Sequence, residues 1–361
     1  MNPPPSTPAP APSEELPSQE PLLSASIYCD GLLDELLQRA VAPFWHQVRQ
    51  DAPPRRYALW MLRYSRRGSH LKVRIHGPPS ASGADRLRQQ LRHHVEPFLA
   101  GLGPRDPSRA RLSSPDTGPM DPEDEGDELH PDRTLLWTNY RLIPGHLGRE
   151  PLSAAPDFAN GYVRCLSAAA DLVLEHLVLE PGGGVRPATR IGFFLRWMLV
   201  ALEALELSPE EELEYLLFHR DWLLLGSKGD WQNAVSFLER KARNAGPQLQ
   251  QLEAAATRRH AGPRESQAPE LPTRWREALR QHFRHALSEL GASDYQALGR
   301  EPRHQLLAAI ARVLHNTANL LEVDLSNEIY VCHLLGRALL PLLGPTPPVS
   351  SFLVNPTQVS Q

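Results

Sequence analysis

Two kinds of hydrophobic pattern divide the chain near residue 157. Before this point, short segments with strand-like alternation or a dense aromatic content are interspersed with segments of helical period, whereas later segments almost all have the helical period. The pattern predicts strands at 23–29, 57–64, 70–76 and 134–143, and helices at 30–49, 85–99, 157–179, 188–206, 209–224, 230–244, 273–290, 302–320 and 325–343. We therefore predict an α+β fold, in which a small antiparallel sheet in the N-terminal half packs with a mostly helical C-terminal half.

The segment 70–76 alternates strictly, and its two faces differ in chemistry. One face carries Leu71, Val73 and Ile75, which we expect in the core; the other carries His70, Lys72, Arg74 and His76. With 57–64 it forms a predicted hairpin, and Arg63 lies across the turn. Guanidinium groups fixed on a sheet match carboxylate or phosphate oxygens two at a time. The alternative interpretation is an ordinary solvent-facing side of a hairpin.

Proline-rich and polar stretches mark the expected boundaries of the folded region. Eight prolines fall in residues 1–21, which we predict to be a disordered arm. Residues 103–132 combine prolines with an acidic run and read as a disordered surface insertion, and 258–273 as a linker between helices. The domain is predicted to span 22–345, followed by a flexible tail at 346–361.

Composition narrows the class of partner. The chain has 361 residues with a formal charge of -4, which argues against nucleic acid as the main ligand. Its three cysteines, Cys29, Cys165 and Cys332, make neither a disulfide framework nor a metal knuckle, so a reducing cytoplasm is expected. No run of about twenty apolar residues predicts a membrane span.

Common catalytic motifs are absent, and the histidines give two weaker candidates. His282 and His285 have a ligand-like spacing, but a solvated helix face is the favoured interpretation because no carboxylate or cysteine stands nearby at ligand spacing. His333 shares an apolar helical stripe with Cys332 and Gly336. It is either a satisfied core residue or, if it lines a cavity, a natural general acid or base.

Two runs, LSASIYCDGLLDELLQRAVAPFWHQV and YALWMLRYSRRGSHLKVRIHG, resemble the thiopeptide-type bacteriocin biosynthesis domain, which is also the C-terminal elimination domain of lantibiotic dehydratases. The family pattern is an aromatic strand ending Arg-Tyr, a short turn, and His-Leu-Arg-Leu-Arg. Arg63-Tyr64 and the segment 70–74 fill this pattern, with Lys72 in place of the first arginine. The family's closing helix, His-Met, two variable residues and Asn-Arg-Leu, is matched loosely from His333 onwards, with Arg337 in place of asparagine. The similarity runs from about residue 22 to 344.

The resemblance implies a stand-alone enzyme that eliminates glutamate from glutamylated serine or threonine of a ribosomally made precursor peptide. A separate dehydratase subunit would add the glutamate from glutamyl-tRNA, and neither metal nor organic cofactor is implied. By the same resemblance, Arg74 and His333 would be catalytic, and elimination requires them to converge on one pocket. Arg63, His70, Lys72, Tyr140 and Arg141 would bind substrate, and either Arg141 or Arg149 would be the family's third arginine.

Two other functions remain open for this fold. Thiopeptide pyridine synthases of the same family join two dehydroalanines in a formal [4+2] cycloaddition and expel the leader peptide. A non-catalytic subunit could instead hold a leader peptide by adding it as a strand to the small sheet.

Overall fold

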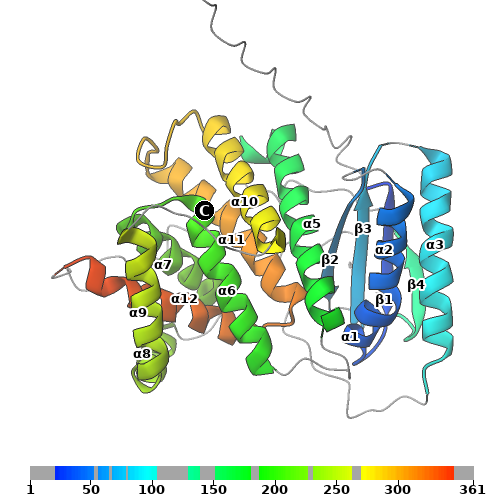
Figure 1. Cartoon of the computed structure of the whole chain (residues 1–361), viewed down its shortest axis with the longest axis horizontal. Coiled ribbons are helices and arrows are strands. Elements are labelled where there is room, and N and C mark those ends of the chain that lie inside the picture. Colours follow the sequence, from blue (N-terminus) through cyan, green and yellow to red (C-terminus); the bar gives the residue numbers. More distant parts are fainter. Residues whose placement is uncertain are drawn as a thin grey trace, which may run out of the picture.

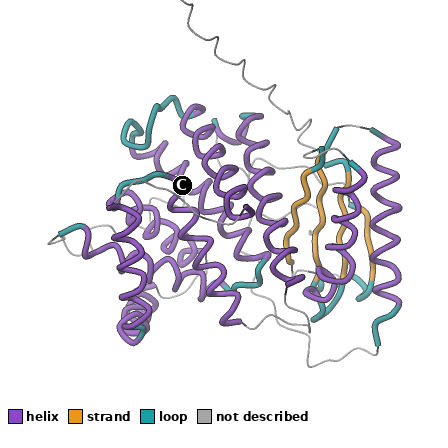
Figure 2. The backbone as a smooth tube through the Cα atoms, viewed as in Figure 1, coloured by secondary structure: helices purple, strands orange, loops and turns teal. Residues whose placement is uncertain are grey.

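The computed structural model describes residues 21–52, 56–64, 67–78, 80–103, 129–138, 151–179, 187–226, 231–261 and 270–344. Figure 1 shows a sheet with its own helices at one end of the molecule and a group of longer helices at the other, and Figure 2 separates the strands from the helices in the same view. Nearly all of the predicted arm and insertion, and the predicted tail, lie outside the described residues. Residues 129–132, the end of the predicted insertion, lie against the sheet, where the Asp132 carboxylate accepts a hydrogen bond from the backbone of Asp30.

The sheet has four antiparallel strands in the order β2-β3-β1-β4. Two helical crossovers join β1 to β2 and β3 to β4, which gives the βαββαβ topology of ferredoxin-like folds. The bounds are β1 Leu23–Tyr28, α1 Leu33–Leu36, a π-helical turn Leu37–Val41, α2 Ala42–Asp51, β2 Ala58–Tyr64, β3 His70–His76, α3 Ala81–Ala100 and β4 Thr134–Trp137. The sheet in the N-terminal half and the helices that follow confirm the predicted α+β class.

The predicted strand register is confirmed. Val73 lies opposite Ala25 of β1 and Met61 of β2. Leu71, Val73 and Ile75 are completely buried, in the same hydrophobic core as the apolar residues of α2 and α3. Strict alternation thus correctly predicted which side of β3 enters this core.

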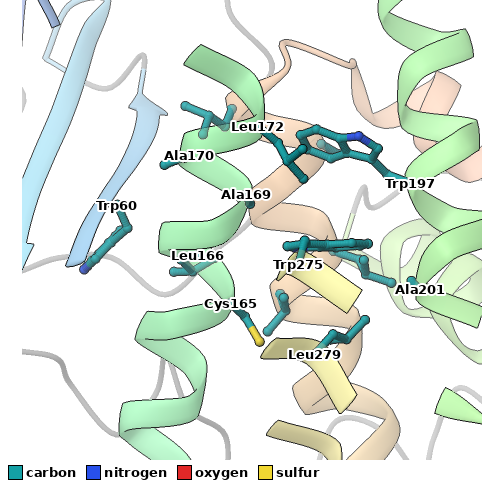
Figure 3. Close-up of a cluster of buried hydrophobic side chains, with 14 of the residues drawn as sticks. Trp60, Cys165, Leu166, Ala169, Ala170, Leu172, Trp197, Ala201, Trp275 and Leu279 are labelled. Atoms are coloured by element: carbon teal, nitrogen blue, oxygen red, sulfur yellow. The ribbon is translucent and has the colours of Figure 1, made fainter. Parts of the chain in front are cut away.

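The second part of the chain is helical from Pro156 onwards. Its elements are α5 Pro156–Leu179, α6 Pro187–Leu205, α7 Pro209–Gly226, α8 Trp231–Asn244, α9 Gly246–Ala261, α10 Glu270–Glu289, α11 Arg300–Leu320 and α12 Leu325–Leu339. Helix α5 lies beside β2 and packs on its other side against α10 (Figure 1). Figure 3 shows the core between α5, α6 and α10, where the rings of Trp197 and Trp275 lie 5.8 Å apart.

The predicted linker at 258–273 is wrong at both ends. Helix α9 continues through Ala261, and α10 begins at Glu270, so only 262–269 falls between the described helices. The charged residues that suggested a linker are the last turn of α9, where cations interact favourably with the helix dipole. Arg259 and His260 also pair with the buried carboxylate of Glu212.

The predicted solvated helix face is also wrong at His282. Its side chain is completely buried, and its ring stacks on Phe158 of α5 at 4.4 Å between centroids. Burial lowers the pKa of His282 to about 3, so the ring is neutral at neutral pH. Within the described part of the chain, no three His, Cys, Asp or Glu side chains are grouped so that they could hold a metal ion.

The contact of α5 with α10 depends on a missing side chain at Gly161. A Cβ atom there would meet the Nδ1 atom of His282 at 2.8 Å and its Cα atom at 3.4 Å. We expect Gly161→Ala to lower the free energy of unfolding by about 1–3 kcal/mol, because a packed helix crossing must open to admit the methyl group. Urea unfolding measures the change.

Gly192→Ala in α6 is the matched control, because nothing lies within 4 Å of a Cβ atom at that exposed position. It is expected to raise the free energy of unfolding by about 0.5–1 kcal/mol through helix propensity alone. Equal effects of the two substitutions would contradict the close packing at Gly161.

Candidate functional site

The basic face of β3 is buried. The exposed fractions of His70, Lys72, Arg74 and His76 are all 2% or less. The interpretation of this face as an ordinary solvent-facing side is therefore wrong. Cations removed from water must be held by hydrogen bonds or by aromatic rings, because an isolated buried charge is costly.

Both cations of this face have such partners. The Nη1 atom of Arg74 donates to the carbonyl oxygens of Ala25, at 2.9 Å, and Val73, at 3.3 Å. The Nζ atom of Lys72 lies 3.9 Å from the centre of the Tyr64 ring, which is a cation–π contact. The face therefore holds two positive charges, from neighbouring outward positions of one strand, in fixed positions.

His70 supplies a neutral imidazole on the same face. Its ring stacks between Tyr28, at 4.5 Å, and Tyr64, at 5.7 Å, and its Nδ1 atom donates to the carbonyl oxygen of Gly68. Burial lowers the pKa of His70 to about 3 despite that hydrogen bond, and the charges of Lys72 and Arg74 act in the same direction. The proton on Nδ1 leaves Nε2 as a hydrogen-bond acceptor. The face thus combines two buried cations with a neutral imidazole.

Arg63 does not join this group. Its position opposite Leu71 places it on the other side of the sheet, where its guanidinium group bonds to the Asp34 carboxylate at 2.6 Å. It also donates to the carbonyl oxygen of Leu320 and lies 3.4 Å from Glu322. The structure therefore gives Arg63 partners at the boundary between the sheet and the helices. Its binding of substrate stays a prediction, as do the roles of Tyr140, Arg141 and Arg149, which lie outside the described residues.

His333 lies on α12, within the helical part. Its Nδ1 atom is 3.3 Å from a guanidinium nitrogen of Arg220, and its Nε2 atom is 3.5 Å from the carboxylate of Glu239. Because arginine only donates, Nδ1 must accept and the proton of the neutral ring sits on Nε2. Burial, together with the charges of Arg220 and Arg337, lowers the pKa of His333 to about 4. His333 is thus a neutral ring beside a carboxylate.

The structure does not bring Arg74 and His333 together. Helix α12 packs mainly against α7, α9 and α8, and its label in Figure 1 lies on the side of α11 away from the sheet. The partners of His333 come from α7 and α8, whereas those of Arg74 come from the sheet itself. Each residue sits in a separate polar group.

Sequence reasoning missed Arg220 and Glu239, the partners of His333. A signal for the first was present: the charged run His219-Arg220-Asp221 interrupts the otherwise apolar segment LLFHRDWLLLG. Three consecutive residues of a helix span most of a turn, so they cannot all face water on a helix buried on several sides. Such a run predicts buried polar contacts without naming their partners.

A family model described as "Lantibiotic biosynthesis dehydratase C-term" matches residues 23–339. The chain belongs to this family. Membership confirms the resemblance to the C-terminal domain of lantibiotic dehydratases seen in the sequence and places the chain in a family of lantibiotic biosynthesis. No curated protein matches the chain.

Solved structures of this lantibiotic dehydratase fold include a "Pyridine synthase, TbtD, from thiomuracin biosynthesis", which is 19% identical with a TM-score of 0.58 and aligns over 90% of this chain and 99% of its own. TsrL is 16% identical with a TM-score of 0.55, over 87% and 93% of the two chains. The tRNA-dependent lantibiotic dehydratase MibB from Microbispora sp. 107891 is 16% identical with a TM-score of 0.48, over 93% of this chain and 29% of its own. At these identities the first two similarities show a shared fold. Among the described helices of this family member, none is long and apolar enough to cross a membrane.

Proposed function

We propose that the chain is a stand-alone enzyme of the pyridine synthase type, which joins two dehydroalanines of a precursor peptide in a formal [4+2] cycloaddition and releases the leader peptide. The observation that carries this choice is that Arg74 and His333 share no partner: Arg74 bonds within the sheet, whereas His333 contacts Arg220 and Glu239 of α7 and α8. Glutamate elimination would use the first residue to hold the γ-carboxylate and the second to move a proton, both on one glutamyl ester. A proton-transfer group must come within hydrogen-bond reach of its target, directly or through one water.

The extent of the shared fold supports the same proposal. The similarity covers 99% of the pyridine synthase TbtD, so the shared fold extends over that whole protein. Such an enzyme would take a peptide that other proteins have already dehydrated, and no glutamylating subunit would have to act at the same time. The reacting alkenes both belong to the peptide, so the proposal requires neither a metal nor an organic cofactor.

The buried face of β3 suits the task that cycloaddition sets. The peptide must be held so that two of its side chains meet, and holding reactants in contact can contribute a large part of the rate enhancement. Donors on Lys72 and Arg74 are suited to carbonyl oxygens of a peptide backbone. Their positions are fixed by the contacts to Tyr64 and Ala25 described above.

Glutamate elimination is the second candidate, because the same two cations are also suited to a γ-carboxylate. In this function a separate glutamylating subunit would supply the substrate. The two reactions differ in the peptide they consume, and this difference makes them separable.

The test offers the purified chain two forms of the precursor peptide encoded beside it, one with two dehydroalanines and one with glutamylated serines. Mass spectrometry follows both. We expect the dehydrated form to lose its leader peptide and give a smaller cyclic product, while the glutamylated form stays unchanged. Loss of glutamate from the second form would overturn the proposal. If Arg74→Ala and His333→Ala each abolished that loss, elimination at a site built from both residues would be established instead.

A further inference from the structure

A buried chain of hydrogen bonds links α7, α11 and α12 apart from the groups described above. The hydroxyl of Tyr215 lies 3.1 Å from Nδ1 of His219, whose Nε2 lies 3.0 Å from one carboxylate oxygen of Glu328. The second oxygen of Glu328 lies 2.8 Å from Nδ1 of His315. One carboxylate therefore holds two histidine rings from two different helices.

These hydrogen-bonded side chains are buried except at His315, and they include an oppositely charged pair. Tyr215, His219 and Glu328 are at most 1% exposed, whereas the side chain of His315 is 20% exposed. Burial would raise the pKa of Glu328, but His315 and His219 outweigh it and hold the pKa at about 2. Burial would likewise lower the pKa of His315, but the Glu328 carboxylate outweighs it, so the pKa lies above its ordinary value. Glu328 is therefore ionised, and the neighbouring His315 is readily protonated.

The two histidines have different freedom to act. His219 has both ring nitrogens engaged inside the chain of hydrogen bonds, so it can only support Glu328. His315 uses Nδ1 alone, and within the described part of the protein its Nε2 atom makes no hydrogen bond. Trp222 meets the ring edge-on at 5.8 Å and fixes its plane. A carboxylate on Nδ1 with Nε2 left to react is the arrangement that orients the histidine of hydrolase triads.

His315 belongs to a row of partly exposed residues on α11 that leads to the sheet. On α11, the partly exposed residues Ala308, Arg312, His315 and Asn319 recur every three or four positions and so form one stripe. Asn319 ends this stripe at β2, where its side chain bonds to both the backbone N–H and the carbonyl oxygen of Arg63. His315 is one helical turn from that contact, or about 6 Å along the axis. An extended peptide along the stripe would reach both the sheet edge and His315.

We infer that His315 is the catalytic acid–base residue of the peptide-modifying reaction, with Glu328 as the positioning residue and His219 and Tyr215 as its support. This role rests on the proposed function. When the leader leaves the ring, the bond between a ring carbon and the leader amide nitrogen breaks, and its electron pair stays on nitrogen. His315 gives its Nε2 proton to that nitrogen, which releases the leader as a carboxamide. The neutral imidazole then takes a proton from the neighbouring ring carbon, and the C–H electron pair completes the pyridine double bond.

The decisive experiment compares His315→Gln with the wild type on whichever of the two peptide forms the wild type converts. We expect kcat to fall about a hundredfold to ten-thousandfold, with KM and the urea midpoint nearly unchanged. The limb of the wild-type pH–rate profile that reports His315 should disappear. His93→Gln, the same change at an exposed site on α3, is the matched control and should keep wild-type activity. Equal activity of the two variants, or a loss explained by unfolded protein, would overturn the inference.

Glu328→Gln tests whether Glu328 positions His315 for catalysis or only stabilises the fold. Without the carboxylate, the pKa of His315 should fall, so the corresponding limb of the pH–rate profile should move to lower pH. Glu328 on α12 is the titratable group bonded to His315, and His219 and Tyr215 on α7 connect to His315 through it. Arg312 lies one turn away on the same stripe of α11, and Tyr162 on α5 bonds to the adjacent Asn316. A purely structural network would lower stability without moving the profile.

A direct measurement keeps the inference testable if the wild type converts neither peptide, a result that would reject the proposed function alone. Histidine NMR of the full chain should give His315 a pKa above 6.5 that falls in Glu328→Gln. Diethyl pyrocarbonate should modify His315 faster than the buried His219. A His315 pKa below 6.5, or a ring as unreactive as His219, would overturn the assignment.

Discussion

Asp34→Asn is expected to lower the free energy of unfolding by about 3–5 kcal/mol, because it removes the negative charge between two buried guanidinium groups. One oxygen of Asp34 bonds to Arg63 at 2.6 Å, and the other bonds to Arg190. The side chains of these arginines are only 8% and 5% exposed. Glu322 would remain as their other carboxylate, at 3.4 and 3.1 Å, and it is one-third exposed. It cannot balance two buried cations.

Chemical unfolding of the full chain measures this effect, and Asp85→Asn is the control. Asp85 also pairs with an arginine, Arg88, but both side chains are about half exposed or more. Exposed pairs of this kind contribute about 0–1 kcal/mol, so the same substitution should change little. A loss at Asp34 as small as that at Asp85 would show that the buried cluster does not hold the sheet to the helices.

This cluster also gives Arg63 a structural role that the sequence did not suggest. Arg63 ends the aromatic strand of the family motif, next to Tyr64, and the motif alone pointed towards substrate. Its partners Asp34 and Glu322 come from α1 and from the turn after α11, and Arg190 of α6 shares both carboxylates, so the members of the cluster are distant in the sequence. A hydrophobic pattern reports only which side of its own element a residue occupies. It carries no information on which distant charge will meet that side.

The strands were predictable because their signal is local. The alternation with a period of two gave the correct first and last residues of β3, and it separated the core face from the basic face correctly. The same pattern could not predict that the basic face is buried, since this depends on what packs over the sheet. Strand β4 ends at Trp137, earlier than the predicted 143, and residues 139–150 lie outside the described part of the chain.

The helices were predictable where apolar stripes were long, and α9 was missed because its apolar stripe is short. Only Leu252 and Ala256 of α9 are buried, so its apolar pattern is two residues four positions apart. In the candidate site, the sequence pattern indicated His333 of α12 as a candidate, but it did not single out Glu328. The available signal was a carboxylate one turn before Cys332 on the buried stripe, because an unpaired acid there would be costly.

Mild acid is expected to destabilise the protein well before its carboxylates titrate. The pKa values of His70 and His282 lie at about 3 and that of His333 at about 4, in each case chiefly because of burial. In the unfolded chain each titrates near 6.5, so between about pH 6.5 and 4 the unfolded state binds more protons. Stability must then fall as the pH falls. Each histidine contributes about 1.4 kcal/mol per pH unit, or roughly 4 kcal/mol per unit for the three together.

Urea unfolding at pH 6 and pH 5 separates the buried histidines from the His315–Glu328 pair, and His94 and His304, whose pKa values burial also lowers, add to the same slope. The raised pKa of His315 gives stability that is fully present below 6.5 and is lost only as the pH rises through the folded value. The lowered pKa of Glu328 gives stability that is lost only below about 4.5, as the pH falls towards 2. Neither group therefore contributes to the slope between pH 6 and pH 5.

His282→Gln should reduce that slope by up to about one-third, because one of the proton-binding sites of the unfolded state is removed. Absolute stability will also change, since the ring stacked on Phe158 is lost, but the slope depends only on proton uptake. A wild-type slope near zero would mean that water reaches the buried rings, and that burial does not hold them neutral.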